Sequence, residues 1–156
     1  MKLRMKALIV SAFSITATLA IVLFSSPACR AQGNRPINPS NASGLPFSEG
    51  VVAGNTLYVA GQEGTDDKGK LVPGGITGET KAALQNIERI VKAAGFEMKD
   101  IVSVTVFLAD IKEFGDMNTV YRSIMPDPKP ARATIQAAAL VNSARIEVSA
   151  IAVKQK

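Results

Sequence analysis

The chain has 156 residues, of which 18 are lysine or arginine and 13 are aspartate or glutamate, giving a formal net charge of +5 at pH 7. It contains no histidine and no tryptophan, and its single cysteine is Cys29. This composition excludes Ser-His-Asp and Cys-His catalysis and histidine metal sites, and neither a G-x-x-x-x-G-K-[ST] nor a G-x-G-x-x-G phosphate motif occurs.

The first 31 residues have the layout of a secretory signal peptide. A basic segment over residues 1–6 precedes an uncharged run over residues 7–24, and an A-x-A site ends at Ala31. Cleavage after Ala31 predicts export to the periplasm or secretion, with no membrane attachment of the processed chain. We favour this over two alternatives: an uncleaved membrane anchor, and a lipoprotein modified at Cys29.

Cleavage would change the composition of the chain. Residues 32–156 keep 14 basic and 13 acidic residues and no cysteine, so the processed chain is nearly neutral and has no disulfide. Near-neutral charge and few aromatic side chains give little basis for binding nucleic acid. Residues 32–44 are rich in proline, glycine, asparagine and serine and predict a flexible spacer, whereas residues 45–156 predict one domain with a single core.

The domain begins with the signal of a β-hairpin. Two short apolar runs, residues 47–52 and 56–60, flank a turn that contains Gly54 and Asn55, which both tolerate positive φ. The polar stretch over residues 61–70 then predicts an exposed loop.

The later elements are recognisable from the period of their apolar residues. The spacing predicts helices over 77–94 and 110–124, and strands over 101–108, 130–140 and 145–153, with a short turn at 141–144 between the last two strands. Gly95 is placed to end the first helix. The order β-β-α-β-α-β-β predicts an α+β fold in which two helices cover one face of a sheet.

The last two strands decide where the charged residues of the sheet lie. If Asn142 and Ser143 form a two-residue turn, these strands pair as a hairpin and Glu147 lies opposite Ala138. Glu147 then shares the uncovered sheet face with Arg132, roughly 20 Å away along the strands. One small-molecule site that used both residues would have to be formed across a subunit boundary, and a mixed polar and apolar sheet face favours an oligomer.

Arg132 and Glu147 are the candidate functional residues that this pattern supplies. The planar guanidinium of Arg132 is suited to binding a carboxylate through two parallel hydrogen bonds, and Thr134 shares its face of the strand. Glu147 lies between apolar neighbours, a setting that suits a general base. The plainer alternatives are a solvated surface arginine and a glutamate paired with a nearby cation.

Five segments of the chain occur in an order that is specific in combination. They are LPFSEG (45–50), YVAGQ (58–62), VTVFLAD (104–110), PAR (130–132) and IEVSAIA (146–152). Together they resemble the RidA/YjgF family of reactive-intermediate (enamine/imine) deaminases, over roughly residues 45–154. The resemblance implies a chorismate-mutase-like α+β fold, a homotrimer with clefts between its subunits, and no cofactor or metal.

The resemblance also implies roles for individual residues. Arg132 matches the arginine that holds the substrate carboxylate, and Glu147 matches the glutamate that orients the attacking water. Gly61 matches the backbone that lines the pocket, and Asn118 matches a pocket asparagine in the second helix. The implied reaction is the hydrolysis of a 2-imino acid, formed from an enamine, to a 2-oxo acid and ammonia.

Three pocket positions depart from the pattern of the family. Phe47 stands where many members have tyrosine, Ala60 where many have serine, and Thr134 where many have cysteine or serine. The first two changes remove hydroxyl groups, each able to contribute about 1 kcal/mol of binding. The alternative function is therefore a trimeric module that binds small carboxylates without turnover. Nuclease activity, also attached to the family, has little electrostatic basis in the processed chain.

Overall fold

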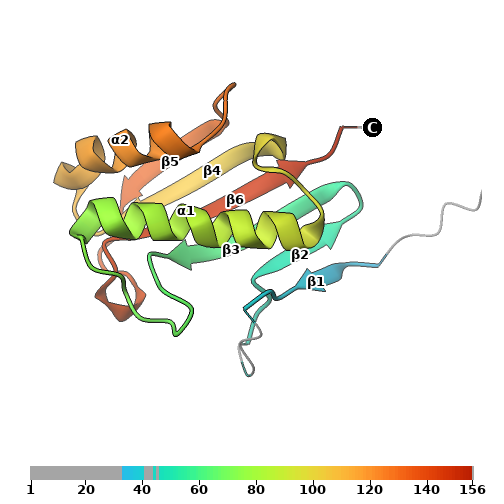
Figure 1. Cartoon of the computed structure of the whole chain (residues 1–156), viewed down its shortest axis with the longest axis horizontal. Coiled ribbons are helices and arrows are strands. Elements are labelled where there is room, and N and C mark those ends of the chain that lie inside the picture. The colour runs from blue at the N-terminus through green and yellow to red at the C-terminus, as the bar shows by residue number, and fades with distance from the viewer. Residues whose placement is uncertain (1–32, 41–43, 45, 156) are drawn as a thin grey trace, which may run out of the picture. The chain divides into compact units, whose positions relative to one another are not determined.

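The computed structural model describes residues 33–40, 44 and 46–155 (Figure 1). The predicted signal peptide over residues 1–31, its cleavage site at Ala31 and the alternative lipidation site at Cys29 all lie outside the described residues. Within the described part of the chain, no helix is both long enough and apolar enough to cross a bilayer.

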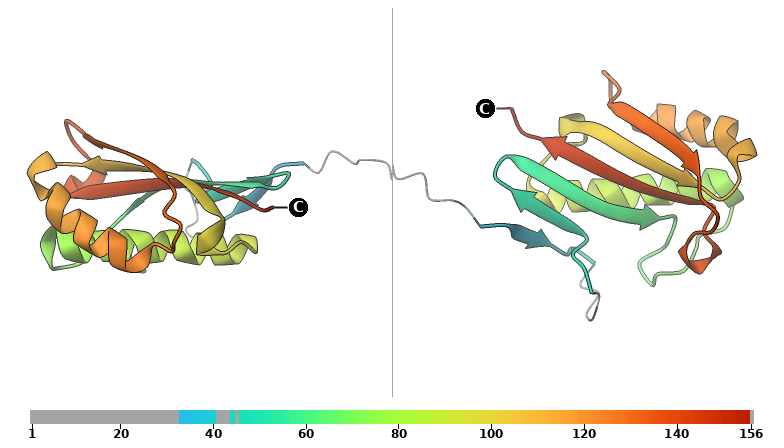
Figure 2. Two further views of the ribbon diagram at one scale, coloured as in Figure 1. Left: turned by 90° about the horizontal axis from the view of Figure 1, so that it is seen from above. Right: turned by 180° about the vertical axis from the view of Figure 1, so that it is seen from behind.

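One mixed sheet of six strands carries the fold, in the spatial order β1-β2-β3-β6-β4-β5. The strands are β1 (Arg35–Ile37), β2 (Gly50–Ala53), β3 (Thr56–Glu63), β4 (Ile101–Leu108), β5 (Ala131–Gln136) and β6 (Ile146–Val153). Helices α1 (Gly75–Ala94) and α2 (Phe114–Ile124) lie on the same face of the sheet (Figure 2). The predicted α+β class is confirmed.

Helix α1 supplies most of the helical side of the core. It begins two residues before the predicted start, and it ends, as predicted, at Gly95, which has a left-handed φ of 84°. Its apolar stripe packs against the sheet, and these residues are at most 1% exposed: Ala83, Leu84, Ile87, Ile90 and Val91. The helical period of the sequence therefore identified the buried face correctly.

Helix α2 is shorter than the sequence pattern suggested. The predicted range 110–124 opens with the 3₁₀ turn η2 (Ile111–Glu113), and α2 follows it. Within α2, only Met117 and Tyr121 are buried, whereas Phe114 is 39% exposed. Because its apolar stripe is only partly covered, this helix leaves aromatic surface beside the edge strand β5.

The predicted hairpin is present as β2 and β3. Ala53 pairs with Thr56, so Gly54 and Asn55 form a two-residue turn, in which Gly54 has a φ of 61°. Strand β3 continues to Glu63, three residues past its predicted end, through a register irregularity between Val59 and Gln62.

The prediction of a flexible spacer over residues 32–44 is wrong for its central part. Arg35–Ile37 forms β1, which pairs antiparallel with β2 and buries Ile37. A three-residue strand is too short to show a period, and Pro36 is tolerated because β1 is at the sheet edge, where an N–H can be spared. The ordered domain therefore begins before residue 45.

The predicted hairpin of the last two strands is also wrong. β5 pairs parallel with β4, whereas β6 lies between β3 and β4 and pairs antiparallel with both. The connection between them carries the 3₁₀ turn η3 (Val141–Ser143), where Asn142 and Ser143 have positive φ. These residues do turn the chain, but toward the centre of the sheet, where β6 has a neighbouring strand on each side.

Candidate active site

Glu147 lies near the centre of the sheet, on the face opposite the helices. Its neighbours in β6, Ile146 and Val148, are fully buried in the core, so strand alternation turns Glu147 to the other face. It pairs with Phe107 of β4 on one side and with Glu63 of β3 on the other. The side chain is half-buried at this position.

Gly61 fits against the side chain of Glu147. A Cβ atom at residue 61 would lie within 2.7 Å of Glu147 Cδ and closer still to Oε1. The carboxylate therefore lies directly over backbone that no side chain covers. Glycine is required here by space, because any other residue would displace the carboxylate.

A hollow of about 810 Å³ opens beside this pair. Four of the predicted site residues line it, namely Phe47, Ala60, Gly61 and Glu147. The structure thus brings together residues from the segment before β2, from β3 and from β6. Phe47 is 55% exposed, so this wall of the hollow is open to solvent.

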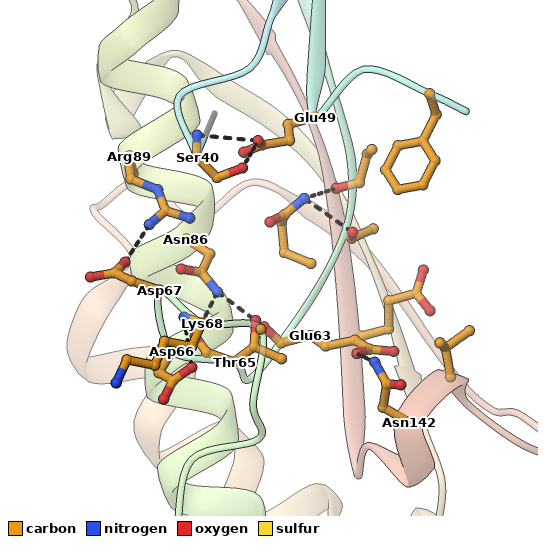
Figure 3. A pocket seen from close by; sticks show the side chains of 17 residues that line it. Ser40, Glu49, Glu63, Thr65, Asp66, Asp67, Lys68, Asn86, Arg89 and Asn142 are labelled. Carbon is orange, nitrogen blue, oxygen red and sulfur yellow. Dashed lines mark hydrogen bonds and ion pairs between the residues drawn. The ribbon is translucent and has the colours of Figure 1, made fainter. Parts of the chain in front are cut away.

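The loop after β3 forms another wall of the hollow and is bound to α1 (Figure 3). Asn86 Nδ2 donates to the backbone carbonyls of Glu63 and Thr65, at 3.2 and 3.1 Å. Arg89 Nη1 forms an ion pair with Asp67 Oδ1 at 2.8 Å. These contacts fix the loop relative to the helix beneath it.

Glu63 is a second glutamate of the hollow, and sequence reasoning missed it because residues 61–70 were assigned to an exposed loop. Asn142 Nδ2 donates to Glu63 Oε2 at 3.1 Å (Figure 3). Burial raises the pKa of Glu63, the hydrogen bond from Asn142 opposes this, and the charges of Glu147 and Glu79 raise it further. Among the described residues, no group of three or more histidine, cysteine or acidic side chains is arranged to hold a metal.

Arg132 is a residue of β5, and its side chain contacts α2. Its Nη2 donates to Asn118 Oδ1 at 2.6 Å. Its guanidinium carbon lies 4.5 Å from the ring centroid of Tyr121 and 5.6 Å from that of Phe114. Two aromatic faces and one neutral amide therefore hold the cation in place.

The surroundings of Arg132 contain no compensating anion. Among the described residues it forms no ion pair. Burial raises the pKa of Tyr121 while the charge of Arg132 opposes the rise, so the phenol is neutral at pH 7. The hydroxyl oxygens of Tyr121 and Thr134 are buried without a hydrogen-bond partner in the described structure. The positive charge of Arg132 is thus available to an external carboxylate.

The expectation that Arg132, Thr134 and Glu147 share the uncovered sheet face is wrong. Arg132 pairs with Val104 and Thr134 with Val106, the buried alternation of β4, so both lie on the helix side. Glu147 pairs with Phe107 and lies on the opposite side. The error follows from the hairpin assumption, since inserting β4 between β5 and β6 changes the register that relates their faces.

The predicted site residues therefore form two separate groups within one subunit. Phe47, Ala60, Gly61 and Glu147 line the hollow, whereas Arg132, Asn118 and Thr134 lie by α2 and do not line it. We call the residues that line the hollow the glutamate group and those beside α2 the arginine group.

Comparison with known proteins identifies one family over a range that includes both groups. The family model described as Endoribonuclease L-PSP matches residues 38–154. The chain is 44% identical over 110 residues to the 2-iminobutanoate/2-iminopropanoate deaminase of Mus musculus, an alignment that spans 70% of this chain and 82% of the mouse protein.

Solved structures show the same fold. RidA from an Antarctic Psychrobacter is 32% identical with a TM-score of 0.73, and the match covers 77% of this chain and 99% of that one. The YjgF gene product of E. coli is also 32% identical, with a TM-score of 0.72, and the match covers 78% of this chain and 99% of that one.

Proposed function

The chain belongs to the RidA/YjgF family, and from that premise we propose that it is a deaminase that hydrolyses 2-imino acids, formed from enamines, to 2-oxo acids and ammonia. The observation that carries the proposal is the carboxylate of Glu147, which lies over the uncovered backbone at Gly61 and faces the hollow. Relatives at this level of identity carry the name 2-iminobutanoate/2-iminopropanoate deaminase.

Glu147 supplies the acid–base chemistry that this hydrolysis needs. Its carboxylate accepts a proton from water as the water oxygen attacks C2 of the substrate, and it then passes this proton to the imine nitrogen, which becomes an amine. In the resulting carbinolamine, the hydroxyl loses its proton, the nitrogen gains one, and the C–N bond breaks to release ammonia. Water and imine are consumed and 2-oxo acid and ammonia are formed, with no redox change.

Arg132 supplies the binding of the substrate carboxylate. Its guanidinium is oriented by Asn118 and the Tyr121 ring and carries a charge that no described side chain neutralises. A planar guanidinium binds a carboxylate through two parallel hydrogen bonds, which fixes the substrate plane relative to the attacking water.

Since the arginine group and the glutamate group lie on opposite faces of one sheet, we assign them to sites shared between subunits of a homotrimer. In each site, one subunit provides Glu147 and a neighbouring subunit provides Arg132. The uncovered sheet face supports this assembly: Tyr58 and Ile151 point away from the core and are 51% and 36% exposed.

The proposal places the protein in the periplasm or outside the cell. Its support is the sequence of the first 31 residues, whose basic start, apolar run and A-x-A site are typical of a signal peptide. The measurement is mass spectrometry of the protein recovered from each cell compartment. A chain beginning at Gln32 in the exported fraction is expected, and an intact chain confined to the cytoplasm would contradict export.

The deaminase activity is tested with freshly generated 2-iminopropanoate and residues 32–156. We expect faster formation of pyruvate than the uncatalysed rate, and a loss of at least about 100-fold in Arg132→Ala and in Glu147→Gln. Phe47 and Ala60 replace hydroxyl-bearing residues of many relatives, so a second outcome is specified. Binding of pyruvate that depends on Arg132, without turnover by the wild type, would identify a carboxylate-binding protein instead.

A further inference from the structure

The hollow beside Glu147 carries an excess of negative charge. Its charged lining residues are Glu49, Glu63, Asp66, Asp67 and Glu147 against Lys68 and Arg89. Among the described residues, Asp67 is the one carboxylate of this set in an ion pair, with Arg89, and Asp66 accepts the backbone N–H groups of Lys68 and Lys70 within its own loop. The three glutamates carry charge that no described cation pairs with.

Glu63 and Glu147 stand side by side on adjacent strands. They are directly paired in the β3–β6 register, so their side chains leave the sheet on the same face. Glu147 lies over Gly61, whereas Glu63 reaches Asn142, so the two carboxylates occupy different parts of the hollow. Neither glutamate has a cationic side chain within ion-pair distance in the described structure.

Glu49 adds a buried carboxylate to the same lining. It is 5% exposed, and its Oε1 accepts a hydrogen bond from the backbone N–H of Ser40 at 3.2 Å. Its Oε2 is buried and has no hydrogen-bond partner in the described part of the chain. A buried carboxylate oxygen without a partner, in the lining of the same hollow as Glu63 and Glu147, is a setting that a cationic group stabilises.

We propose that Glu63 makes this site selective for 2-imino acids whose side chain carries a positive charge, and that it disfavours those with a second carboxylate. The inference rests on the proposed deaminase function, in which Arg132 takes the substrate carboxylate and Glu147 faces the imine carbon. The side chain of the substrate then lies in the part of the hollow beyond Glu147, where Glu63 is held by Asn142. A guanidinium or ammonium group placed there gains an anionic partner, and a carboxylate is repelled.

Glu63→Gln is the direct test, because glutamine keeps the size of the side chain and an oxygen for Asn142 while removing the charge. Imines are generated in situ by oxidation of arginine, alanine and glutamate, at a pH where uncatalysed hydrolysis is slow. For each variant, kcat/KM for the arginine-derived and glutamate-derived imines is divided by the value for the alanine-derived imine. Glu88→Gln, a charge change of the same kind on the outer surface of α1, is the matched control.

In the wild type and in Glu88→Gln, the relative kcat/KM for the arginine-derived imine is expected to exceed that for the glutamate-derived imine. In Glu63→Gln this ratio falls about tenfold, because one charge changes the two rates in opposite directions by about threefold each across a partly solvated pocket. A ratio that stays within about twofold of the wild-type value overturns the inference.

Failure of the deaminase function is recognised separately. If the wild type hydrolyses none of the three imines, that function is contradicted, and charge preference is then measured by calorimetric binding of 5-guanidino-2-oxopentanoate, pyruvate and 2-oxoglutarate. Preference for the guanidino acid that is lost in Glu63→Gln would still support selection by Glu63, and equal binding of the three acids would overturn it.

Discussion

The glutamate group and the arginine group hold their charged residues in opposite ways. Glu147 lies among other acids, over bare backbone, on a sheet face without helices. Arg132 is held by aromatic rings and an amide, on the helix side of an edge strand. Neither group contains a counter-ion for its own charge, and each would complement the other. Under the proposed function, a subunit presents two half-sites, and a second copy of the chain joins them.

The strongest test of this division is to mix two inactive variants. Arg132→Ala and Glu147→Gln are each expected to lose at least about 100-fold in turnover. When the two proteins are unfolded, mixed in equal amounts and refolded, a site with both native residues forms at about one interface in four by random assembly. Activity near a quarter of the wild-type value is expected. Activity that stays at the level of the variants would place both residues of a site in one subunit.

The uncompensated charge of the arginine group can be neutralised with Asn118→Asp. The new carboxylate would lie where Asn118 Oδ1 now accepts from Arg132, and it would form an ion pair that competes with the substrate carboxylate. We expect KM to rise about tenfold or more with a smaller change in kcat, and thermal stability to be unchanged or higher. Asn118→Ala, which removes the hydrogen bond without adding a charge, is the control and should raise KM less.

The contact between Gly61 and the Glu147 carboxylate can be disrupted with Gly61→Ala. The added methyl group would occupy space that the Glu147 carboxylate now fills, so the carboxylate must move. A displaced base reduces kcat by about tenfold, while the melting temperature changes little because a half-buried side chain can relocate toward the hollow. Gly115→Ala is the matched control, since a Cβ atom there has no neighbour within 4 Å. Equal kcat values for the two variants would contradict the proposed role of this contact.

The smallest expected effect is a pH dependence of stability in the glutamate group. Burial raises the pKa of Glu63 above its ordinary value of 4.5, with Glu147 and Glu79 adding to the rise and Asn142 opposing it. The folded state then binds the proton more tightly, so this contribution to stability is complete below about pH 4.5 and is lost as pH rises through the raised pKa.

Urea unfolding of the wild type and Glu63→Gln at pH 4, 5.5 and 7 measures this contribution. Relative to Glu63→Gln, the wild type should lose stability with rising pH, by less than about 1 kcal/mol because solvent screens a half-exposed group. Glu88→Gln should not show this trend. If the difference in unfolding free energy between the wild type and Glu63→Gln stays constant with pH, or rises in favour of the wild type, the anionic form of Glu63 is not destabilised in the folded state.

The sequence predicted the elements better than their arrangement. β4 was placed at its observed bounds, and α1 to within two residues at its start and at its exact end, because each is long and has a regular apolar period. β1 was missed because three residues with a proline show no period. The predicted pairing of β5 with β6 was wrong. The turn signal at Asn142 indicates that the chain reverses, but it does not indicate which strand then lies beside β5.

The candidate site shows the same limit. Residues Gly61, Ala60, Phe47 and Glu147, which the family motifs identified, do line one hollow. Arg132 is separated from them because it lies on the other face of the sheet. The face that each residue occupies depends on the strand order and on the register of every pair between them, which is a property of the whole topology. Glu63 was missed because strand β3 continues through an irregularity into residues whose composition is that of a loop.

The position of β6 also bears on how this chain folds as it is made. β6 is the last strand in chain order, yet it lies between β3 and β4 and pairs with both. During synthesis, β3 and β4 are complete before β6 exists, and they have no strand of their own to join across the gap. β1, β2 and β3 pair among themselves, and β4 pairs with β5, so the continuous six-stranded sheet is completed only in a late step that waits for β6. Ribosome-bound chains cut short before residue 146 are expected to remain protease-sensitive.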